Sequence, residues 1–357
     1  MSLIDDAPLG HFDRERTLLP LLENYETLQP EPMTLEEFTA LDARAKAAFN
    51  DRRIDRIAGN TDILTPDLKD LLREVQRASL RMSRAVGRTS VMVSGPPTAG
   101  KTTAAKHVMV DALRRHERQH PEWKTLNHSP IVYVEVPSSC TPKNLMGRFL
   151  TFLGIRFTAH TTVEERTKLV TDALIRRRTS LIVIDEMQNM AFTGRGHSET
   201  QQATKNLMNA VPAVPLYLGF NLEQKLHSDK GLGEQFAARS TLVRLTHFGR
   251  DTAEERKLWG AIVYAFESQL GLLAQPPKSL PAAHADYLWS RSRGSLSALS
   301  RLLTTVALDL IDADDPTKEF ITREHMGTVR LDVTSEREYE REVQRGSKKK
   351  KVTARAA

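Results

Sequence analysis

Short apolar runs alternate with amphipathic segments through the middle of the chain, between residues 90 and 249. The runs are rich in Val, Ile and Leu, as buried strands are, and lie at 91–94, 131–136, 180–185, 215–220 and 240–245. Between them, apolar residues at helical spacing predict helices at 101–119, 141–153, 163–178 and 199–210. This alternation predicts an α/β core built on a parallel sheet with helical crossovers.

The segments on either side of this core have a helical pattern. A capping box at Thr34 and Glu37 starts a polar helix near the N-terminus, and a second helix is expected at 66–86. Beyond Gly249, helices are expected at 252–270, 284–292 and 295–312. We therefore predict four parts: a helical arm at 1–60, an α/β core at 61–249, a helical lid at 250–335 and a basic, disordered tail at 336–357.

The segment after the first predicted strand matches the pattern G-x-x-x-x-G-K-[ST]. It consists of Gly95, Pro96, Pro97, Thr98, Ala99, Gly100, Lys101 and Thr102. Gly95 and Gly100 let such a loop wrap a phosphate, and the backbone amides of Ala99 to Thr103 are expected to face it at the start of the next helix. Lys101 is expected to contact the β- and γ-phosphates and Thr102 to bind Mg²⁺. The strand, loop and helix together predict an ATP site. The alternative is a chance match to the pattern in a glycine turn.

An acidic pair follows the apolar strand at 180–185. Asp185 is expected to hold Mg²⁺ through water, and Glu186 to orient or deprotonate the attacking water. Ligands of open α/β sheets bind at the carboxyl ends of the strands, where this pair is predicted to lie. A strand end that simply meets solvent is the alternative.

Two further polar residues are candidates for sensing the γ-phosphate. Asn221 follows the strand at 215–220, where its amide is suited to hold the lytic water; a turn cap is the alternative. Arg239 precedes the last strand and is a candidate arginine finger that acts on the nucleotide of a neighbouring subunit. For Arg239, an ordinary surface arginine is the alternative.

Composition and charge add limits. The single cysteine, Cys140, excludes an internal disulfide, and no stretch has the roughly 18 to 20 apolar residues of a membrane-spanning helix, so we expect a cytoplasmic protein with no membrane partner. The net charge is +6, but six of the 51 basic residues follow Glu342, and the other 45 balance the 45 acidic residues. The tail is thus a candidate for contacts with nucleic-acid phosphates. The alternative is a solvated, disordered terminus.

Other basic residues give weaker signals. Arg176, Arg177 and Arg178 end a predicted helix, where cations are favoured without any ligand. His116 and His120 share a helix face, but no third metal ligand is apparent in the sequence. Residues Lys143, Arg148 and Arg156 are weak candidates for DNA contacts, with a solvated face as the alternative.

These motifs, in this order, resemble a family: the AAA+ ATPases of transposition, the TniB, TnsC and MuB group, with TniB closest. The resemblance runs from about residue 80 to residue 307 and includes the segments VEVPSSCTPKNLMGRFLTFLG, LIVIDEMQNM, PLYLGFN, QFAARSTLVRL and GSLSALSRLL. It implies that Asn221 occupies the sensor-1 position and that Arg239 lies in the arginine-finger segment. The implied fold is a P-loop NTPase core with a C-terminal helical lid.

The sequence departs from that family at two positions. Family members commonly have His where Gln188 stands, which leaves the tuning of the neighbouring glutamate open. Many AAA+ proteins place a sensor-2 arginine three residues after the glycine that opens a lid helix, whereas here Ser297 stands at that spacing from Gly294. Arg301, one turn later, is the candidate replacement.

The resemblance implies an ATPase that assembles with ATP and Mg²⁺ into a ring or helical filament on double-stranded DNA. Such a protein selects target sites and recruits or regulates a transposase or another recombination protein. Two alternatives remain: a helicase loader or initiator-type ATPase, and a regulatory switch protein that binds ATP without DNA-dependent turnover.

Overall fold

The computed structural model describes residues 12–25, 30–59, 63–82, 89–138, 140–190, 195–224, 239–332, 335–337 and 339. The chain divides into two compact units, Met1–Tyr25 with Pro66–Leu245 and Glu26–Thr65 with Thr246–Ala357. Each unit has its own hydrophobic core, and each is described here by itself.

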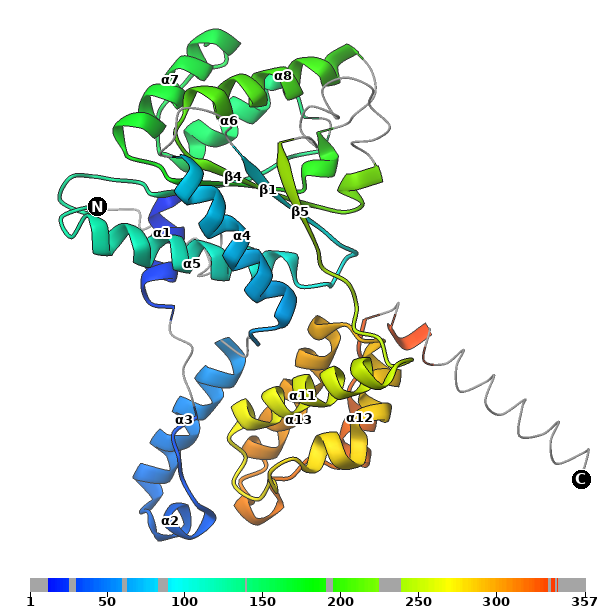
Figure 1. The fold of residues 1–357 in the computed structure, drawn as a ribbon. Helices are drawn as coiled ribbons and strands as arrows, with labels where there is room; N and C mark the ends of the chain where they lie inside the picture. Colours follow the sequence, from blue (N-terminus) through cyan, green and yellow to red (C-terminus); the bar gives the residue numbers. More distant parts are fainter. Residues whose placement is uncertain are drawn as a thin grey trace, which may run out of the picture. The chain divides into compact units, whose positions relative to one another are not determined.

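A five-stranded parallel sheet forms the centre of the first unit (Figure 1). Its strands are β1 (Ser90–Ser94), β2 (Ile131–Glu135), β3 (Leu181–Asp185), β4 (Val214–Gly219) and β5 (Ser240–Arg244). Their spatial order is β2-β3-β4-β1-β5, and every pair is parallel. Strands β1, β3 and β4 are buried along their whole length, which is why they consist almost entirely of apolar residues. The five predicted strands and the α/β class are confirmed.

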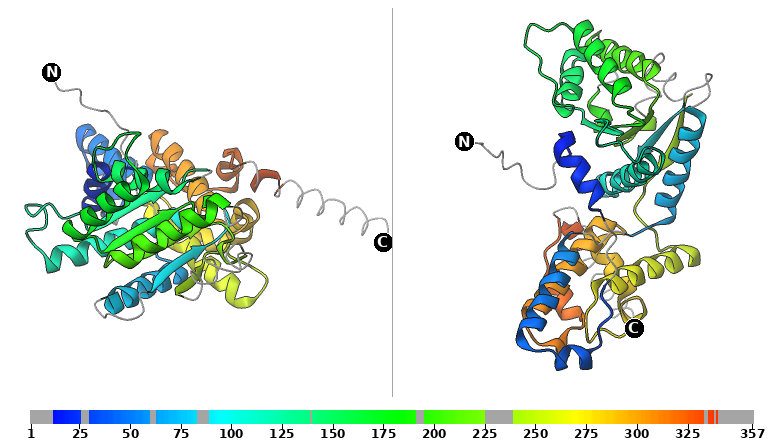
Figure 2. Two further views of the ribbon diagram at one scale, coloured as in Figure 1. Left: turned by 90° about the horizontal axis from the view of Figure 1, so that it is seen from above. Right: turned by 90° about the vertical axis from the view of Figure 1, so that its left-hand side faces the viewer.

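Helices cover both faces of this sheet (Figures 1 and 2). One face carries α1 (Glu15–Glu23), α4 (Pro66–Met82) and α5 (Lys101–Gln119), and the other carries α6 (Pro142–Phe152), α7 (Val163–Arg176) and α8 (Arg195–Ala210). Helix α7 begins with a capping box at Thr162 and Glu165. It ends two residues before the predicted end because Arg178 has a left-handed backbone, with φ of 53°.

The second unit is helical. It contains α2 (Leu35–Ala40), α3 (Ala43–Gly59), α11 (Ala253–Leu270), α12 (Ser279–Ser292), α13 (Leu296–Asp312) and α14 (Arg323–Thr328). Helix α12 begins five residues before the predicted start at residue 284, because Pro281 lies in its first turn, where a missing amide hydrogen costs nothing. No helix in the described segments is long and apolar enough to cross a membrane.

The predicted arm at 1–60 is divided between the two units. Leu18 and Leu22 of α1 are buried in the core of the first unit. In the second unit, Arg53 of α3 forms a buried ion pair with Glu319, at 2.7 Å, and Ile57 joins the core. The arm therefore supplies apolar and ionic contacts to both units, which its polar composition did not reveal. The boundaries at 60 and 249 stay a prediction for the domains of the chain.

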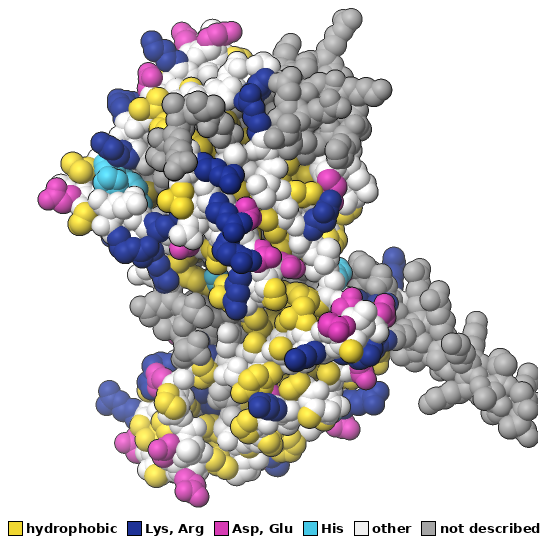
Figure 3. All heavy atoms as spheres, viewed as in Figure 1, with side chains coloured by type: hydrophobic (Ala, Val, Ile, Leu, Met, Phe, Trp, Pro, Cys, Tyr) yellow, Lys and Arg dark blue, Asp and Glu magenta, His cyan; other side chains and the backbone are white. Residues whose placement is uncertain are grey.

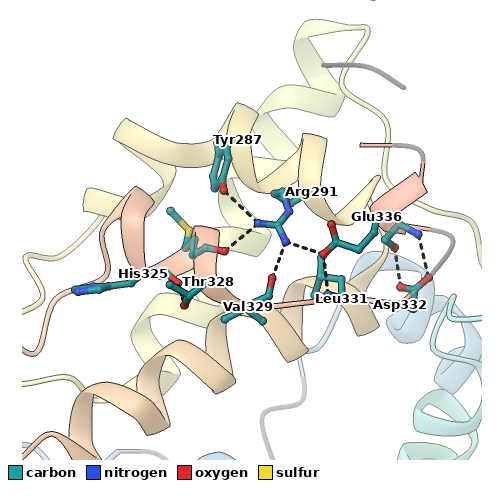
Figure 4. A network of polar contacts seen from close by, with 10 residues as sticks. Tyr287, Arg291, His325, Thr328, Val329, Leu331, Asp332 and Glu336 are labelled. Carbon is teal, nitrogen blue, oxygen red and sulfur yellow. Dashed lines mark hydrogen bonds and ion pairs between the residues drawn. The ribbon is translucent and has the colours of Figure 1, made fainter. Parts of the chain in front are cut away.

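One buried arginine, Arg291, contacts the segment 326–336 of the second unit (Figure 4). The guanidinium of Arg291 in α12 donates to the carbonyls of Met326 and Val329, at 2.9 and 2.8 Å, and to the carboxylate of Glu336 at 2.9 Å. Glu336 also accepts from the amide of Leu331, at 2.8 Å. Charge-assisted bonds of this kind are stronger than neutral ones, so Arg291 fixes the segment after α14 onto α12.

Three histidines gather near the end of α5. The rings of His116 and His128 are in hydrogen-bonding contact, with 3.1 Å between Nε2 and Nδ1, and the ring of His120 lies 4.7 Å from that of His116. Burial, together with the neighbouring His120 and His128 rings and Arg178, lowers the pKa of His116 to about 4. Among the described residues, no group of three His, Cys, Asp or Glu is arranged to hold a metal ion.

This low pKa predicts acid sensitivity. An unfolded histidine has a pKa of about 6.5, so below that pH the unfolded state takes up a proton that folded His116 does not accept until about pH 4. We expect His116 to lower the free energy of unfolding by about 1.5 kcal/mol between pH 6.5 and pH 5. Urea unfolding at both pH values tests this, with His116→Gln as the comparison. An equal pH dependence in the two proteins would contradict it.

Candidate functional site

The strand order brings the sequence motifs together at the carboxyl ends of the strands. Strand β4 lies between β3 and β1, so its end lies between the acidic pair and the phosphate loop, residues 95–102. Two hydrogen bonds join the end of β4 to the end of β1: the Gly95 amide donates to the Gly219 carbonyl at 3.2 Å, and the Leu222 amide donates to the side-chain Oγ of Ser94 at 3.1 Å. The ends of β1 and β4 are therefore held together beyond the strand pairing itself.

The phosphate loop depends on its glycines and on Lys101. A Cβ at Gly95 would lie 2.3 Å from the carbonyl oxygen of Leu245, so no side chain fits there. Gly100 has φ of 83° and caps the start of α5. The ammonium of Lys101 donates to the carbonyls of Gly95 and Pro96, at 2.9 Å each. Burial lowers the pKa of Lys101, and the nearby Asp185 and Glu186 act in the opposite direction.

Asp185 is the best-anchored acid of the site. Its side chain is buried, and its carboxylate accepts from Tyr133 Oη at 2.8 Å, from Thr102 Oγ1 at 3.5 Å and from the Glu186 amide at 2.7 Å. A threonine hydroxyl beside a carboxylate is a set of hard oxygen donors, which is what Mg²⁺ prefers. Thr102 and Asp185 thus have the chemistry and the proximity that a magnesium site needs.

Tyr133 was missed by the sequence reasoning. Burial and the charge of Asp185 raise the pKa of its phenol, so the hydroxyl stays protonated and donates. Strands β2 and β3 pair with Glu135 opposite Asp185, and Tyr133, two residues before Glu135, points to the same face. The signal was available only once the register was known.

Glu186 lies at a tight turn directly after β3. Its backbone is left-handed, with φ of 55°, which is unusual for a residue other than glycine, asparagine or aspartate. Its carboxylate accepts from the side-chain amide of Gln188, in the short helix η1 (Met187–Asn189). Gln188 in turn accepts from the amide of Phe220, at 3.0 Å. The position noted as a departure from the family thus connects Glu186 to the end of β4.

Asn221 lies next to these groups. It follows the Phe220 amide that contacts Gln188 and precedes the Leu222 amide that contacts Ser94. Its φ is 51°, and it is half-buried. A left-handed asparagine also suits a turn, so its position agrees with both interpretations made from the sequence.

Arg239 lies where β5 begins, at the amino-terminal end of the strands, and the phosphate loop lies at their carboxyl end. Its carbonyl accepts from the Ser90 amide at 3.0 Å, where β5 and β1 begin, while the phosphate loop follows the other end of β1. Five residues of β1 span about 16 Å, more than an arginine side chain can reach. The exposed Arg239 side chain therefore cannot act on the phosphate loop of its own subunit.

The remaining predicted residues are dispersed. Thr103 is exposed in the first turn of α5, and Arg301 is exposed on α13 of the second unit. Lys143 donates to the Ala159 carbonyl at 2.7 Å, and Arg156 is exposed. The roles predicted for these residues stay predictions.

A cavity of about 440 Å³ lies on the β2 side of the acidic pair. Thr102, Tyr133 and Glu135 line it, together with the exposed Arg148 of α6. Its contact with Thr102 and Tyr133 places it directly beside the oxygen donors of the proposed magnesium site.

Solved structures resemble the chain in fold. ORC1 of Aeropyrum pernix, in complex with DNA, matches with a TM-score of 0.52 and 19% identity over 77% of this chain and 66% of that chain. Cdc6p of Pyrobaculum aerophilum matches with a TM-score of 0.51 and 14% identity over 73% and 67%. Aeropyrum pernix ORC2, in its ADPNP–ADP complexes, has a TM-score of 0.51 and 14% identity over 77% and 69%. These likenesses confirm the predicted AAA+ class of fold.

At the level of sequence, no curated protein matches the chain. The family of bacterial TniB proteins matches residues 53–248, which include the phosphate loop, the acidic pair, Asn221 and Arg239. The match covers more than half of the 357 residues, so the chain belongs to the bacterial TniB family.

Proposed function

We propose that this protein binds ATP with Mg²⁺ at the phosphate loop and hydrolyses it in an assembly on double-stranded DNA. One observation carries the proposal: the carboxyl ends of β1, β3 and β4 bring Lys101, Thr102, Asp185 and Glu186 to one edge of the sheet. A cation, two oxygen ligands and a second carboxylate, that of Glu186, beside a phosphate-binding loop are the parts that phosphoryl transfer to water needs.

Each residue has a defined task in this proposal. Lys101 exchanges its two carbonyl partners for phosphate oxygens, and the backbone amides from Ala99 to Thr103 donate to the same phosphates. Thr102 and Asp185 hold Mg²⁺, which when bound offsets the charge of the phosphates. Glu186 accepts the proton of the attacking water, and the Asn221 amide orients that water.

Glu186→Gln tests the chemical step. The amide keeps the size of the side chain but cannot accept the proton, so turnover should fall by about 100-fold or more while ATP affinity stays the same. Steady-state phosphate release and calorimetric ATP titration measure the two quantities. Glu164→Gln, an exposed substitution on α7, is the control and should change neither. Unchanged turnover in Glu186→Gln would move the catalytic role to another residue.

The edge position of Arg239 supports an assembly of several subunits. Because Arg239 cannot reach its own phosphate loop, a catalytic role requires a second copy of the chain. A ring or helical filament satisfies that requirement if the surface that carries Arg239 on one subunit faces the phosphate loop of the next subunit.

DNA contact is proposed on charge. In the view of Figure 3, Lys and Arg side chains are interspersed with Asp and Glu, as expected where bases and acids are equal in number. The six basic residues after Glu342 are the unbalanced charge of the chain. They are proposed to contact DNA phosphates, with Lys143, Arg148 and Arg156 as further candidates.

The role in transposition rests on the family. We propose that the DNA-bound assembly selects target sites and recruits or regulates a transposase. The fold likeness to ORC1 and Cdc6p keeps an initiator or helicase loader as the second candidate. An ATP-binding switch protein is the third. Stimulation of ATP turnover by duplex DNA separates the first two candidates from the third.

A further inference from the structure

The side chain of Gln188 forms a bridge between two parts of the candidate site. Its Oε1 accepts from the Phe220 amide, at 3.0 Å, and its Nε2 donates to Glu186 Oε2. The backbone N–H of Phe220 can only donate, so this contact fixes which end of the Gln188 amide faces Glu186. The Glu186 carboxylate therefore meets an N–H donor.

The glycine at the end of β4 makes room for this bridge. A Cβ at Gly219 would lie 2.5 Å from Gln188 Oε1, so the glycine at the end of β4 makes space for the amide. Glu186 and Asn221, on the two sides of the bridge, both have left-handed backbones, with φ of 55° and 51°. A left-handed backbone is common for asparagine but uncommon for glutamate, so the conformation of Glu186 indicates a specific local geometry at this bridge.

We infer that Gln188 is a positioning residue that fixes the Glu186 carboxylate to the end of β4 and so couples it to Asn221. The inference rests on the proposed function, in which Glu186 and Asn221 act on the same water. A shift of the β4 end then moves the proton acceptor and the water-orienting amide together. Gln188 itself touches neither water nor nucleotide in this account.

The chemistry of the bridge makes a distinctive prediction for histidine. A glutamine amide is donor and acceptor at every pH, whereas imidazole is both only when neutral. Protonation turns both ring nitrogens into donors, which removes the acceptor for the Phe220 amide. Gln188→Met, of similar length, removes both hydrogen bonds at every pH.

The experiment compares Gln188→Met and Gln188→His with the unmodified protein between pH 5.5 and 8.5. Gln188→Met should lower kcat by about 10- to 100-fold, the scale of a misplaced catalytic group, with KM for ATP changed less than about threefold. Gln188→His should lie within about threefold of the unmodified kcat at pH 8 and lose turnover through an added ionisation near pH 6.5. Gln76→His, exposed on α4, is the control and should add no ionisation.

A readout without nucleotide accompanies the kinetics. Hydrogen exchange of the Phe220 amide should become at least about tenfold faster in Gln188→Met, because its acceptor is lost. Unchanged exchange and unchanged kcat in Gln188→Met would overturn the inference, as would a Gln188→His profile that matches the unmodified protein. A lower kcat together with a higher KM and a lower Tm would also overturn it, since these three changes together indicate general destabilisation. An unmodified protein without any ATP turnover would refute the proposed function instead.

Discussion

Arg239→Ala should lower ATP turnover by about 1,000-fold while each subunit keeps its affinity for ATP. The backbone of Arg239 directly precedes β5 and contacts the start of β1, and the length of β1, about 16 Å, separates it from the phosphate loop of the same subunit, so removal of the side chain leaves that loop intact. A positive charge supplied by a neighbour stabilises the charge that develops on the transferred phosphoryl group. Phosphate release and calorimetric ATP titration measure the two effects, with Arg176→Ala, exposed on α7, as the control.

Mixing two inactive variants sharpens this test. Arg239→Ala keeps its phosphate loop, and Lys101→Ala keeps its Arg239. A junction between the two variants therefore contains one intact loop and one intact arginine, so the mixture should regain part of the turnover that each variant lacks alone. Full activity of Arg239→Ala by itself, at every protein concentration, would contradict action between subunits and favour the ATP-binding switch.

Lys101→Ala should abolish nucleotide binding, which we expect as a loss of at least about 100-fold in ATP affinity. The Lys101 ammonium is held inside the loop by two carbonyls and lies near Asp185 and Glu186. Among the described residues, no other lysine or arginine lies within the loop 95–102, so nothing replaces its charge beside the phosphates. Calorimetry with ATP and Mg²⁺ measures the affinity, and the exposed Lys69→Ala on α4 is the control. Undiminished affinity would refute this site.

Much of the fold could be predicted from local sequence patterns. Strands buried on both faces must be apolar throughout, which made β1, β3 and β4 recognisable as continuous runs. The phosphate loop and the acidic pair could also be identified, because their chemistry restricts which residues can occupy each position. Both signals depend only on residues that are close in sequence.

The parts that escaped prediction depend on contacts between distant residues. Tyr133 reaches Asp185 across 52 positions, and its role follows from the β2–β3 register. The buried ion pair between Arg53 and Glu319 could not be predicted from the polar sequence of the helix that contains Arg53. Gln188 was noted only as a substitution in a motif, since its contact with Phe220 becomes visible once β4 lies beside β3. Arg301 stays a prediction, because it belongs to the second unit.

The central claim is that the edge formed by β1, β3 and β4 hydrolyses ATP in a DNA-bound assembly. Its most direct test is the ATP turnover of the unmodified protein over a range of protein concentrations, with and without duplex DNA. The account predicts that turnover per subunit rises with protein concentration, rises further with DNA, and is lost in Glu186→Gln. Turnover that is absent under all these conditions, or that is the same per subunit at every concentration with or without DNA, would contradict it.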